Sequence, residues 1–427
     1  MPSPPSEPNL YPPTVTLVRR LTREGPDPGP TTPADIEAWL LGPAIDEDDT
    51  AALIDRLAWR LWAAGLGVDR FSAHAGTLHP QAIGVAWNWS RATRTCDEIR
   101  VAPEAVAHDS FRRNPIYGVI EHGEPFRGMI DDPAAKARFP IFEQFAGQGF
   151  TEYAAIPVGR DRGRHNAVTV ATSRPGGFAP GALEAVERLV RIFALHLQRH
   201  VASRIARNIV RTYLGEEAGI RVLDGTISRG AGEIDEATIW MSDLRGFTTL
   251  SERLPPETML ALLDAYFDVM AEAVMAEGGE VLKFIGDGLL AAFGRRGGEA
   301  REPAAGALRA ARRALAHLDR LNAAPPAPPA PLAKAEGWRP LATGIGLHFG
   351  RVFFGNVGAP ARLDFTVIGR AVNLASRVEG LCRPLGRPIL LTEAVARLLD
   401  EPLDDLGLHE VKGLAEPVRI LAPRLRE

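Results

Sequence analysis

The N-terminal half of the chain alternates between helical and strand-like patterns of apolar residues. Leucines recur every fourth residue from Leu53 to Leu61, which predicts an amphipathic helix. Asp49 or Thr50 is placed to cap this helix, and Gly65 to end it. After it we expect strands at residues 69–75, 83–89, 153–158 and 167–172, a loop-rich middle, and a long helix from about residue 182.

The C-terminal half also contains segments with a helical and segments with a strand-like spacing of apolar residues, in a different order. A helix is expected to start at Pro255 and to end at Gly278, following the preference for proline first and glycine last. A second helix is expected over residues 303–321. The predicted strands lie at residues 238–242, 282–285, 289–293, 342–349 and 352–357. The proline-rich stretches 1–45 and 323–340 predict an irregular arm and an exposed loop or small insertion.

Two aspartates stand where apolar strands end. Asp243 follows one strand directly, and Asp287 lies between two glycines at the tip of a predicted hairpin. The glycines let backbone approach a ligand closely, although Gly-Asp-Gly also makes a good plain hairpin turn. Lys283 favours a functional site, because a cation within an apolar strand loses hydration unless an anion or acceptor meets it.

Three ordered motifs around these aspartates resemble the class III nucleotide cyclases, the family of adenylate and guanylate cyclases. They are the stretch from Ser242 to Thr248, the set Glu280, Lys283, Gly286 and Asp287, and the stretch from Asp364 to Arg377. The resemblance runs from about Gly232 to the C-terminus. It implies a ferredoxin-like α/β catalytic domain that pairs head to tail in a homodimer with two composite sites.

The resemblance implies a site with two metal ions, Mg²⁺ or Mn²⁺. Asp243, Asp287 and the carbonyl group of Leu244 would be the metal ligands. Backbone amides near Gly246 and Phe247 would face the substrate phosphates.

The resemblance also implies roles in substrate binding. Lys283 would read adenine, and guanine readers usually carry Glu at this position; Thr366 stands where many adenylate cyclases carry Asp, a replacement known for a subgroup with Thr or Ser. Asn373 would orient the ribose, and Arg377 would stabilise the pentavalent phosphorus. Lys412, in a short Val-Lys-Gly match, would bind the triphosphate or is a plain surface lysine.

The arrangement of helix, strands, variable middle, strands and closing helix looks like a GAF domain, and residues 151–189 carry most of that resemblance. PAS-like domains share the layout. Either implies a sensor for a small-molecule effector. The residues expected near such a ligand are Trp87, Trp89, Tyr117, His122, Arg127 and Tyr153, with core aromatics and surface charges as the alternative.

The long helix from residue 182 carries an apolar seam. The seam consists of Leu183, Val186, Val190, Phe193 and Leu197, with Val201, Ile205 and Ile209 continuing at four-residue steps. Such a seam packs on its own domain or on the same helix of a second chain. The position between sensor and catalytic domain favours a parallel dimer stalk.

Composition indicates which partners and which cellular compartment to expect. The chain has 427 residues, 24% charged, with a net charge of −4, so nothing indicates nucleic acid as a partner. Cys96 and Cys382 lie far apart without metal-ligand spacing, which favours a reducing compartment. No leader or membrane-spanning pattern is evident, so we expect a cytoplasmic protein without membrane contact.

These observations predict an α+β protein with a GAF-like sensor, a helical stalk and a cyclase domain. The expected boundaries are 1–45 for the arm, 46–181 for the sensor, 182–231 for stalk and connector, and 232–427 for the catalytic domain. The expected function is an adenylate cyclase that converts ATP to 3′,5′-cyclic AMP and pyrophosphate. A guanylate or pyrimidine cyclase, or a catalytically silent regulatory protein, is the alternative.

Overall fold

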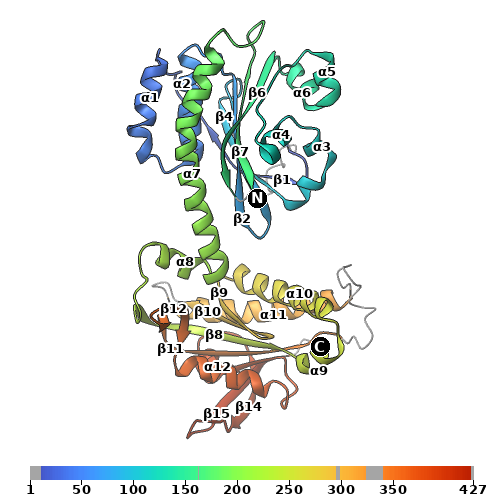
Figure 1. Cartoon of the computed structure of the whole chain (residues 1–427). Helices are drawn as coiled ribbons and strands as arrows, with labels where there is room; N and C mark the ends of the chain where they lie inside the picture. The colour runs from blue at the N-terminus through green and yellow to red at the C-terminus, as the bar shows by residue number, and fades with distance from the viewer. Residues whose placement is uncertain (1–10, 162, 295–298, 324–339, 425–427) are drawn as a thin grey trace. The chain divides into compact units, whose positions relative to one another are not determined.

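A computed structural model describes residues 11–161, 163–294, 299–323 and 340–424. Within it the chain forms two compact units, Met1–Ile209 and Val210–Glu427 (Figure 1). The proline-rich loop expected over residues 323–340 falls almost entirely outside the described residues. No helix among the described residues is long and apolar enough to cross a membrane.

Unit 1 is built on a seven-stranded antiparallel sheet in the order β1-β4-β3-β2-β7-β6-β5. Its strands are β1 Val15–Thr22, β2 Arg70–His79, β3 Ala82–Ser90, β4 Thr95–Val101, β5 Phe126–Met129, β6 Glu152–Asp161 and β7 Arg164–Thr172. Its α-helices are α1 Pro33–Leu40, α2 Thr50–Ala63, α3 Asp109–Arg112, α4 Ile116–His122, α5 Pro133–Arg138, α6 Ile141–Gly147 and α7 Ala182–Leu214, with 3₁₀ turns at Pro43–Asp46 and Pro103–Ala107.

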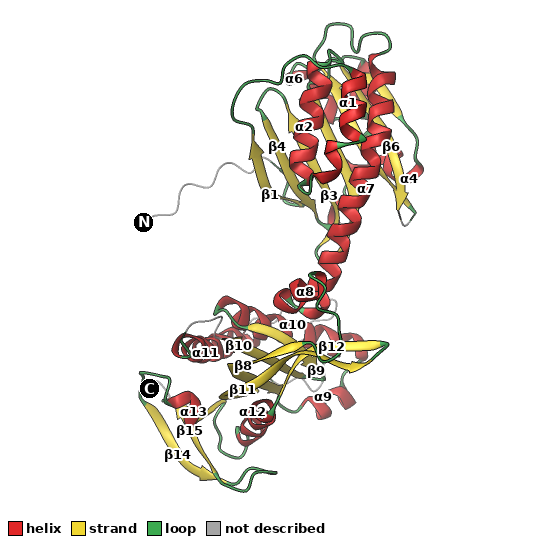
Figure 2. Cartoon of the chain, turned by 90° about the vertical axis from the view of Figure 1, so that its left-hand side faces the viewer, coloured by secondary structure: helices red, strands yellow, loops and turns green. Residues whose placement is uncertain are grey.

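Two cores cover the two faces of this sheet. Helices α1, α2 and α7 lie on one face (Figure 2), where Trp59, Trp89 and Phe193 are buried together. Helices α4 and α6 pack on the opposite face around Phe142 and Tyr153. The predicted helix at α2 is confirmed, with the Asp49 carboxylate accepting from the first backbone amides.

The N-terminal residues are more ordered than the proline content indicates. β1 pairs with β4, so residues 15–22 are an edge strand rather than part of an irregular arm. Thr32 caps α1 in a capping box with Asp35. The pairing partner lies about 80 residues away in sequence, which local composition does not reveal.

The seam of α7 is buried within unit 1 and corrects the stalk prediction for that part of the helix. Leu183, Val186, Val190, Phe193 and Leu197 all belong to the core beneath α2. Their spacing therefore serves packing on their own domain, and they are not available to a partner helix. Further along α7, Ile205 is partly buried on the same core and Ile209 is exposed.

Unit 2 contains an eight-stranded sheet in the order β14-β15-β13-β11-β8-β10-β9, with β12 paired to β11. Its strands are β8 Gly232–Leu244, β9 Glu280–Ile285, β10 Gly288–Gly294, β11 Thr343–Ala359, β12 Arg362–Ile368, β13 Ile389–Thr392, β14 Leu403–His409 and β15 Val418–Pro423. Its helices are α8 Glu216–Leu223, α9 Phe247–Arg253, α10 Pro256–Ala276, α11 Arg301–Ala323, α12 Arg370–Leu381 and α13 Glu393–Ala396.

The core of unit 2 has the ferredoxin-like order. Strands β8, β9, β10 and β11 lie as β11-β8-β10-β9, with α10 and α11 as the crossovers. Side chains of β10 alternate between faces: Leu289 and Phe293 meet α10 and α11, while Leu290 joins α12 on the other face. The two strands expected at 342–349 and 352–357 form one continuous strand, β11.

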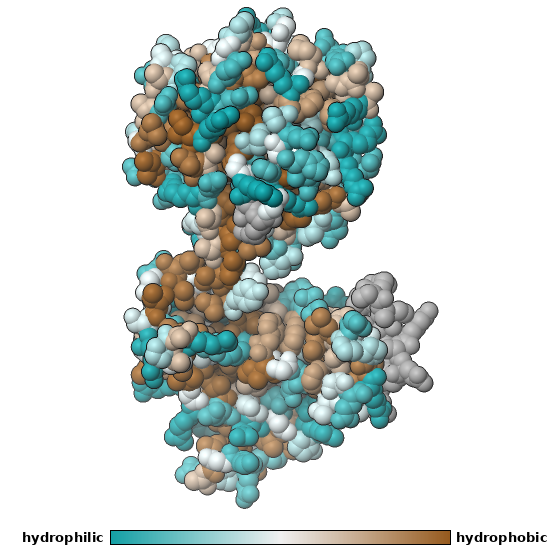
Figure 3. All heavy atoms as spheres, in the orientation of Figure 1, coloured by the Kyte–Doolittle hydropathy of each residue, from teal (hydrophilic) through white to brown (hydrophobic). Residues whose placement is uncertain are grey.

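Apolar side chains gather on the surface over α8 (Figure 3). Ile220 and Leu223 of this helix are 41% exposed, and Ile227 just beyond it is 61% exposed. The sequence reading treated this segment only as a connector.

Candidate active site

The strand ladder brings the two predicted metal aspartates together. In the antiparallel pair β8–β10, Gly288 lies opposite Asp243, so Asp287 stands beside Asp243 at the same end of the sheet. Gly286 adopts a left-handed φ of 63°, which favours glycine in this tight turn. A Cβ on Gly288 would lie 2.9 Å from the carbonyl oxygen of Ser242, so the two strands need glycine to come this close.

The negative charges of Asp243 and Asp287 lie close enough to repel each other, so a bound cation would stabilise the pair. Burial and the neighbouring Asp243 charge raise the pKa of Asp287 to about 6. Two carboxylates and nearby backbone carbonyl oxygens are the hard ligands that Mg²⁺ and Mn²⁺ take. Since no larger group of His, Cys, Asp and Glu gathers among the described residues, the fit rests on this pair.

A buried hydroxyl chain fixes the end of β8. Tyr266 of α10 bonds to the hydroxyl of Thr343 at 2.8 Å, and Thr343 donates to the backbone oxygen of Asp243 at 2.9 Å. Burial raises the pKa of Tyr266, so it remains a neutral donor. Local sequence does not reveal this contact, because Tyr266 and Thr343 lie 77 residues apart.

Positions 344 and 346 of β11 are both glycine, and an ion pair and helix α12 leave room for nothing larger. Arg245 and Glu379 lie 3.7 Å apart, and a Cβ on Gly344 would overlap both side chains. A Cβ on Gly346 would overlap the backbone of α12. Burial, followed by the Asp243 and Asp287 charges, raises the pKa of Glu379 to about 7, against the lowering effect of Arg245.

The backbone after Leu244 turns from strand into helix. Gly246 has a left-handed φ of 75° and precedes α9, whose first residue is Phe247. The backbone amide of Arg245 donates a hydrogen bond to the carbonyl oxygen of Ala342. The first amides of helix α9, in contrast, have no acceptor within the helix. This local geometry is compatible with the expected phosphate contact.

Lys283 is paired with Asp364, a residue for which the sequence motifs indicated no role of its own. On β9 it forms an ion pair with Asp364 of β12, and both side chains are about half exposed. Thr366 lies two residues beyond Asp364, so both side chains point to the same face of β12. The acceptor expected for Lys283 is thus present within the chain.

Asn373 and Arg377 lie one helical turn apart on α12 and are both exposed. The buried side of this helix carries Ala371, Ala375 and Val378 instead. Among the described residues, neither Asn373 nor Arg377 bonds to Asp243 or Asp287, so one chain does not bring the two halves of the predicted site together by direct contact. Lys412 is exposed in a turn after buried Val411.

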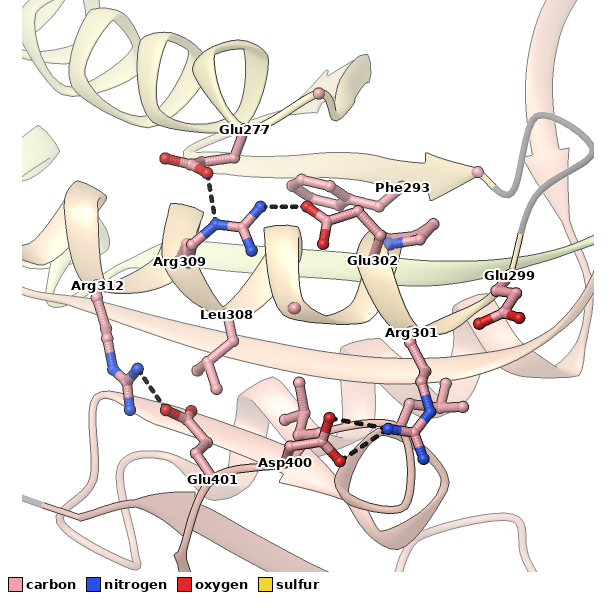
Figure 4. Close-up of a pocket in the computed structure, with 16 residues that line it drawn as sticks. Glu277, Phe293, Glu299, Arg301, Glu302, Leu308, Arg309, Arg312, Asp400 and Glu401 are labelled. Carbon is pink, nitrogen blue, oxygen red and sulfur yellow. Dashed lines mark hydrogen bonds and ion pairs between the residues drawn. The ribbon is translucent and has the colours of Figure 1, made fainter.

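One hollow of unit 2 lies away from the aspartates. It measures about 960 Å³ and is lined by α11, the end of β10 and residues 398–401 (Figure 4). Its arginines are neutralised by protein acids: Arg301 by Asp400 at 2.7 Å, Arg309 by Glu277 at 2.8 Å, and Arg312 by Glu401 at 2.8 Å. Among the described residues that line this hollow, each arginine is thus paired with a carboxylate and none is left to bind a triphosphate.

The residues expected around a sensor ligand fall on different faces of unit 1. Trp87 and Trp89 are buried in the core beneath α2, where the Trp89 indole donates to Asp55 at 3.0 Å. Tyr153 lies in the other core, stacked on Phe145. Of the remaining three, Tyr117 meets His122 edge to face, and Arg127 pairs with Glu152. The six therefore do not form one pocket.

Comparison with known proteins agrees with the geometry of unit 2. Residues 230–419 match the family described as the adenylate and guanylate cyclase catalytic domain. The chain is 37% identical over 200 residues to an adenylate cyclase of Anabaena cylindrica, covering 45% of this chain and 38% of that protein. It is 32% identical over 235 residues to adenylate cyclase 1 of Rhizobium meliloti, covering 55% and 32%. The chain thus spans about a third of the length of these curated relatives.

Among solved structures, a bacterial light-regulated adenylyl cyclase is 32% identical, with a TM-score of 0.38, covering 45% of this chain and 91% of that one. The family match contains Asp243, Asp287, Asn373 and Arg377. Residues 230–419 of this chain therefore form a catalytic domain of the class III adenylate and guanylate cyclase family.

Proposed function

We propose that unit 2 is an adenylate cyclase that converts ATP to 3′,5′-cyclic AMP. The 3′-oxygen of ATP forms a bond to the α-phosphorus, the bond from that phosphorus to the β-phosphate oxygen breaks, pyrophosphate leaves, and the hydroxyl proton passes to solvent. The observation that carries the proposal is the register of β8 and β10, which sets Asp243 beside Asp287 within a cyclase-family domain.

Bound at these aspartates and at the Leu244 carbonyl, two divalent ions, Mg²⁺ or Mn²⁺, would lower the pKa of the 3′-hydroxyl and screen the triphosphate. The chain itself supplies the remaining parts. Backbone amides at Gly246 and Phe247 would orient the phosphates. Asn373 would hold the ribose, and Arg377 would offset charge that develops on the phosphorus oxygens. Lys412 would bind the outer phosphates.

Adenine as the base is supported by two observations. Lys283 is a hydrogen-bond donor suited to adenine N1, where guanine carries a proton. Both relatives described above are named adenylate cyclases. Thr366, on the same face as Asp364, would add a hydroxyl to this base site.

Two composite sites in a homodimer would join the separated parts. Asn373 and Arg377 are exposed and do not bond to the paired aspartates of their own chain. In a two-fold dimer, a patch on each chain meets its complement on the other, so metals from one chain and ribose contacts from the other would form each site. The exposed apolar residues over α8 fit burial against a second copy.

The direct test is incubation of the purified protein with each of ATP, GTP, CTP and UTP in the presence of Mn²⁺. We expect cyclic AMP from ATP, with a kcat/KM far above that for the other three. Comparable values for GTP, or a preference for a pyrimidine nucleotide, would refute the adenine assignment. No turnover of any nucleotide would favour a silent regulatory protein.

We further propose that unit 1 is a GAF-like sensor that regulates this activity in response to a small-molecule effector. Helix α7 is continuous from Ala182 to Leu214, and so extends past the last residue of unit 1. A chain beginning at Gly232 should keep the cyclase reaction but differ from the full chain in specific activity or dimer affinity. Equal values of both for the two proteins would argue against regulation by unit 1.

A further inference from the structure

The central strand of unit 1 carries two buried polar side-chain atoms that have no hydrogen-bond partner among the described residues. Arg70, Ser72 and His74 occupy alternate positions of β2, so they lie on one face of the sheet. The Oγ of Ser72 and the Nε of Arg70 are buried, and neither has a hydrogen-bond partner among the described residues. Buried polar groups are seldom left in this state.

The neighbouring strands extend this polar surface. In the ladder, Ser72 lies opposite Thr169 of β7 on one side and Asn88 of β3 on the other. We call Arg70, Ser72, His74, Asn88 and Thr169 the β2 polar face.

The remaining neighbours of the β2 polar face are small. Ala171 lies opposite Arg70, and both Ala86 and Ala167 lie opposite His74. The long polar side chains of Arg70 and His74 therefore have small side chains beside them on the neighbouring strands.

Among the described residues, no carboxylate balances the charge of Arg70. Burial lowers the pKa of this guanidinium, and its electrostatic neighbours are the hydroxyls of Tyr153 and Tyr11. Burial also raises the pKa of both tyrosines to about 12, so they are neutral at physiological pH. His74 is neutral as well, since burial and then Arg70 lower its pKa to about 3. Asp97, two strands away, is engaged by Arg20 and Tyr11.

The covering residues supply an apolar wall. The Arg70 guanidinium carbon lies 5.4 Å from the Phe145 ring of α6, and Phe145 stacks on Tyr153 at 5.5 Å. Phe142 belongs to the same cluster. A cation with neutral hydrogen-bonding groups on one side and aromatic rings on the other suits an organic anion, whose charged group meets the arginine and whose carbon skeleton meets the rings.

We infer that the β2 polar face binds a small molecule through an oxyanion, a carboxylate or a phosphate group, with Arg70 as the charge partner and Ser72 as a hydrogen-bonding partner. A planar guanidinium matches both groups in geometry. The inference gives the chemistry of the effector that the proposed regulation of unit 1 requires. Binding at this site does not depend on the cyclase reaction.

Thermal unfolding of the full chain, followed by tryptophan fluorescence, tests the site. Unit 1 holds five of the seven tryptophans, Trp39, Trp59, Trp62, Trp87 and Trp89, so the signal reports mainly on this unit. Acetate, pyruvate and succinate form the carboxylate arm, and inorganic phosphate and glycerol 3-phosphate the phosphate arm, each against sodium chloride at equal ionic strength. At about 100 times its Kd, a ligand should raise the midpoint by about 5 °C or more.

Arg70→Gln should abolish that rise and, without anion, should unfold at a higher temperature than the wild type because the unbalanced charge is gone. Arg100→Gln is the matched control, since Arg100 of β4 lies opposite Val85 of β3 and hence on the other face of the sheet, the face that carries Trp87 and Trp89. Its response to the anion should equal that of the wild type.

Ser72→Ala keeps the charge and should weaken binding by about fivefold, which gives a second measurement should Arg70→Gln fail to fold. Lack of stabilisation beyond chloride in both arms, or an unchanged response in Arg70→Gln or Ser72→Ala, would overturn the inference. Stabilisation without any effect on cyclic AMP formation would support the site and count against the proposed regulation only.

Discussion

Replacing Asp287 with asparagine should stabilise the metal-free protein while removing its activity. The pKa of about 6, against an ordinary 3.8, corresponds to about 3 kcal/mol of unfavourable interaction with the ionised carboxylate. Because the side chain is only partly buried, solvent screening reduces this to about 1–1.5 kcal/mol. For a unit of this size the gain corresponds to about 2–6 °C in Tm.

The difference in Tm between Asp287→Asn and the wild type should depend on pH. The folded protein holds the Asp287 proton more tightly than the unfolded chain, so the penalty is absent below about pH 4 and complete above about pH 6. Asp287→Asn should therefore exceed the wild type in Tm at pH 8 in EDTA and match it near pH 4. The wild type should regain the difference when Mn²⁺ is added, whereas the variant should not respond.

Calorimetric scans of both proteins at pH 4 and pH 8, with EDTA or Mn²⁺, measure these differences. Asp264→Asn is a matched control, because Asp264 is an exposed carboxylate on α10 of the same unit. It should leave both Tm and the response to Mn²⁺ unchanged. Equal Tm values for Asp287→Asn and the wild type at pH 8 would refute the argument from repulsion between the two carboxylates.

Three further changes probe the proposed cyclase site. Tyr266→Phe removes the hydroxyl that supports the end of β8, so we expect a loss of about 1 kcal/mol in unfolding free energy and a higher Mn²⁺ requirement in activity assays; an unchanged Mn²⁺ titration would exclude a positioning role. Asp364→Ala releases Lys283 from an exposed ion pair and should raise KM for ATP by no more than about fivefold, whereas Lys283→Ala should cost more; the reverse order in steady-state kinetics would contradict this ranking. Equal amounts of Asp287→Ala and Arg377→Ala chains, after free exchange, should recover about a quarter of wild-type activity, since half of the dimers are mixed and each holds one intact site; absence of recovery would argue against composite sites.

Much of the catalytic domain could be predicted because its information is local. Asp243 and Asp287 stand at strand ends with turn glycines beside them, and the ladder of β8 and β10 brings them together as expected. The α10 helix begins and ends where proline and glycine place it. Asp364 and Tyr266 were missed as functional residues, because their partners lie 81 and 77 residues away.

In unit 1, local sequence predicted the helices but not what they pack against. Its helices α2 and α7 follow from periodicity, but the same seam of α7 is compatible with packing on its own sheet or on a second chain, and only the fold assigns it to the core beneath α2. The aromatic residues expected around an effector separate onto two faces, because Trp87 and Trp89 of β3 point to one face and the register of β6 turns Tyr153 to the other.

The sequence by itself determined the periods of the helices and strands, the turn glycines and the order of the cyclase motifs, because each depends on residues close together in the chain. Only the tertiary structure decided which long-range partners meet: β1 with β4, Lys283 with Asp364, and Arg70 with neutral neighbours. The physical reason is that burial and charge balance depend on all the elements that surround a side chain, and these come from distant parts of the sequence.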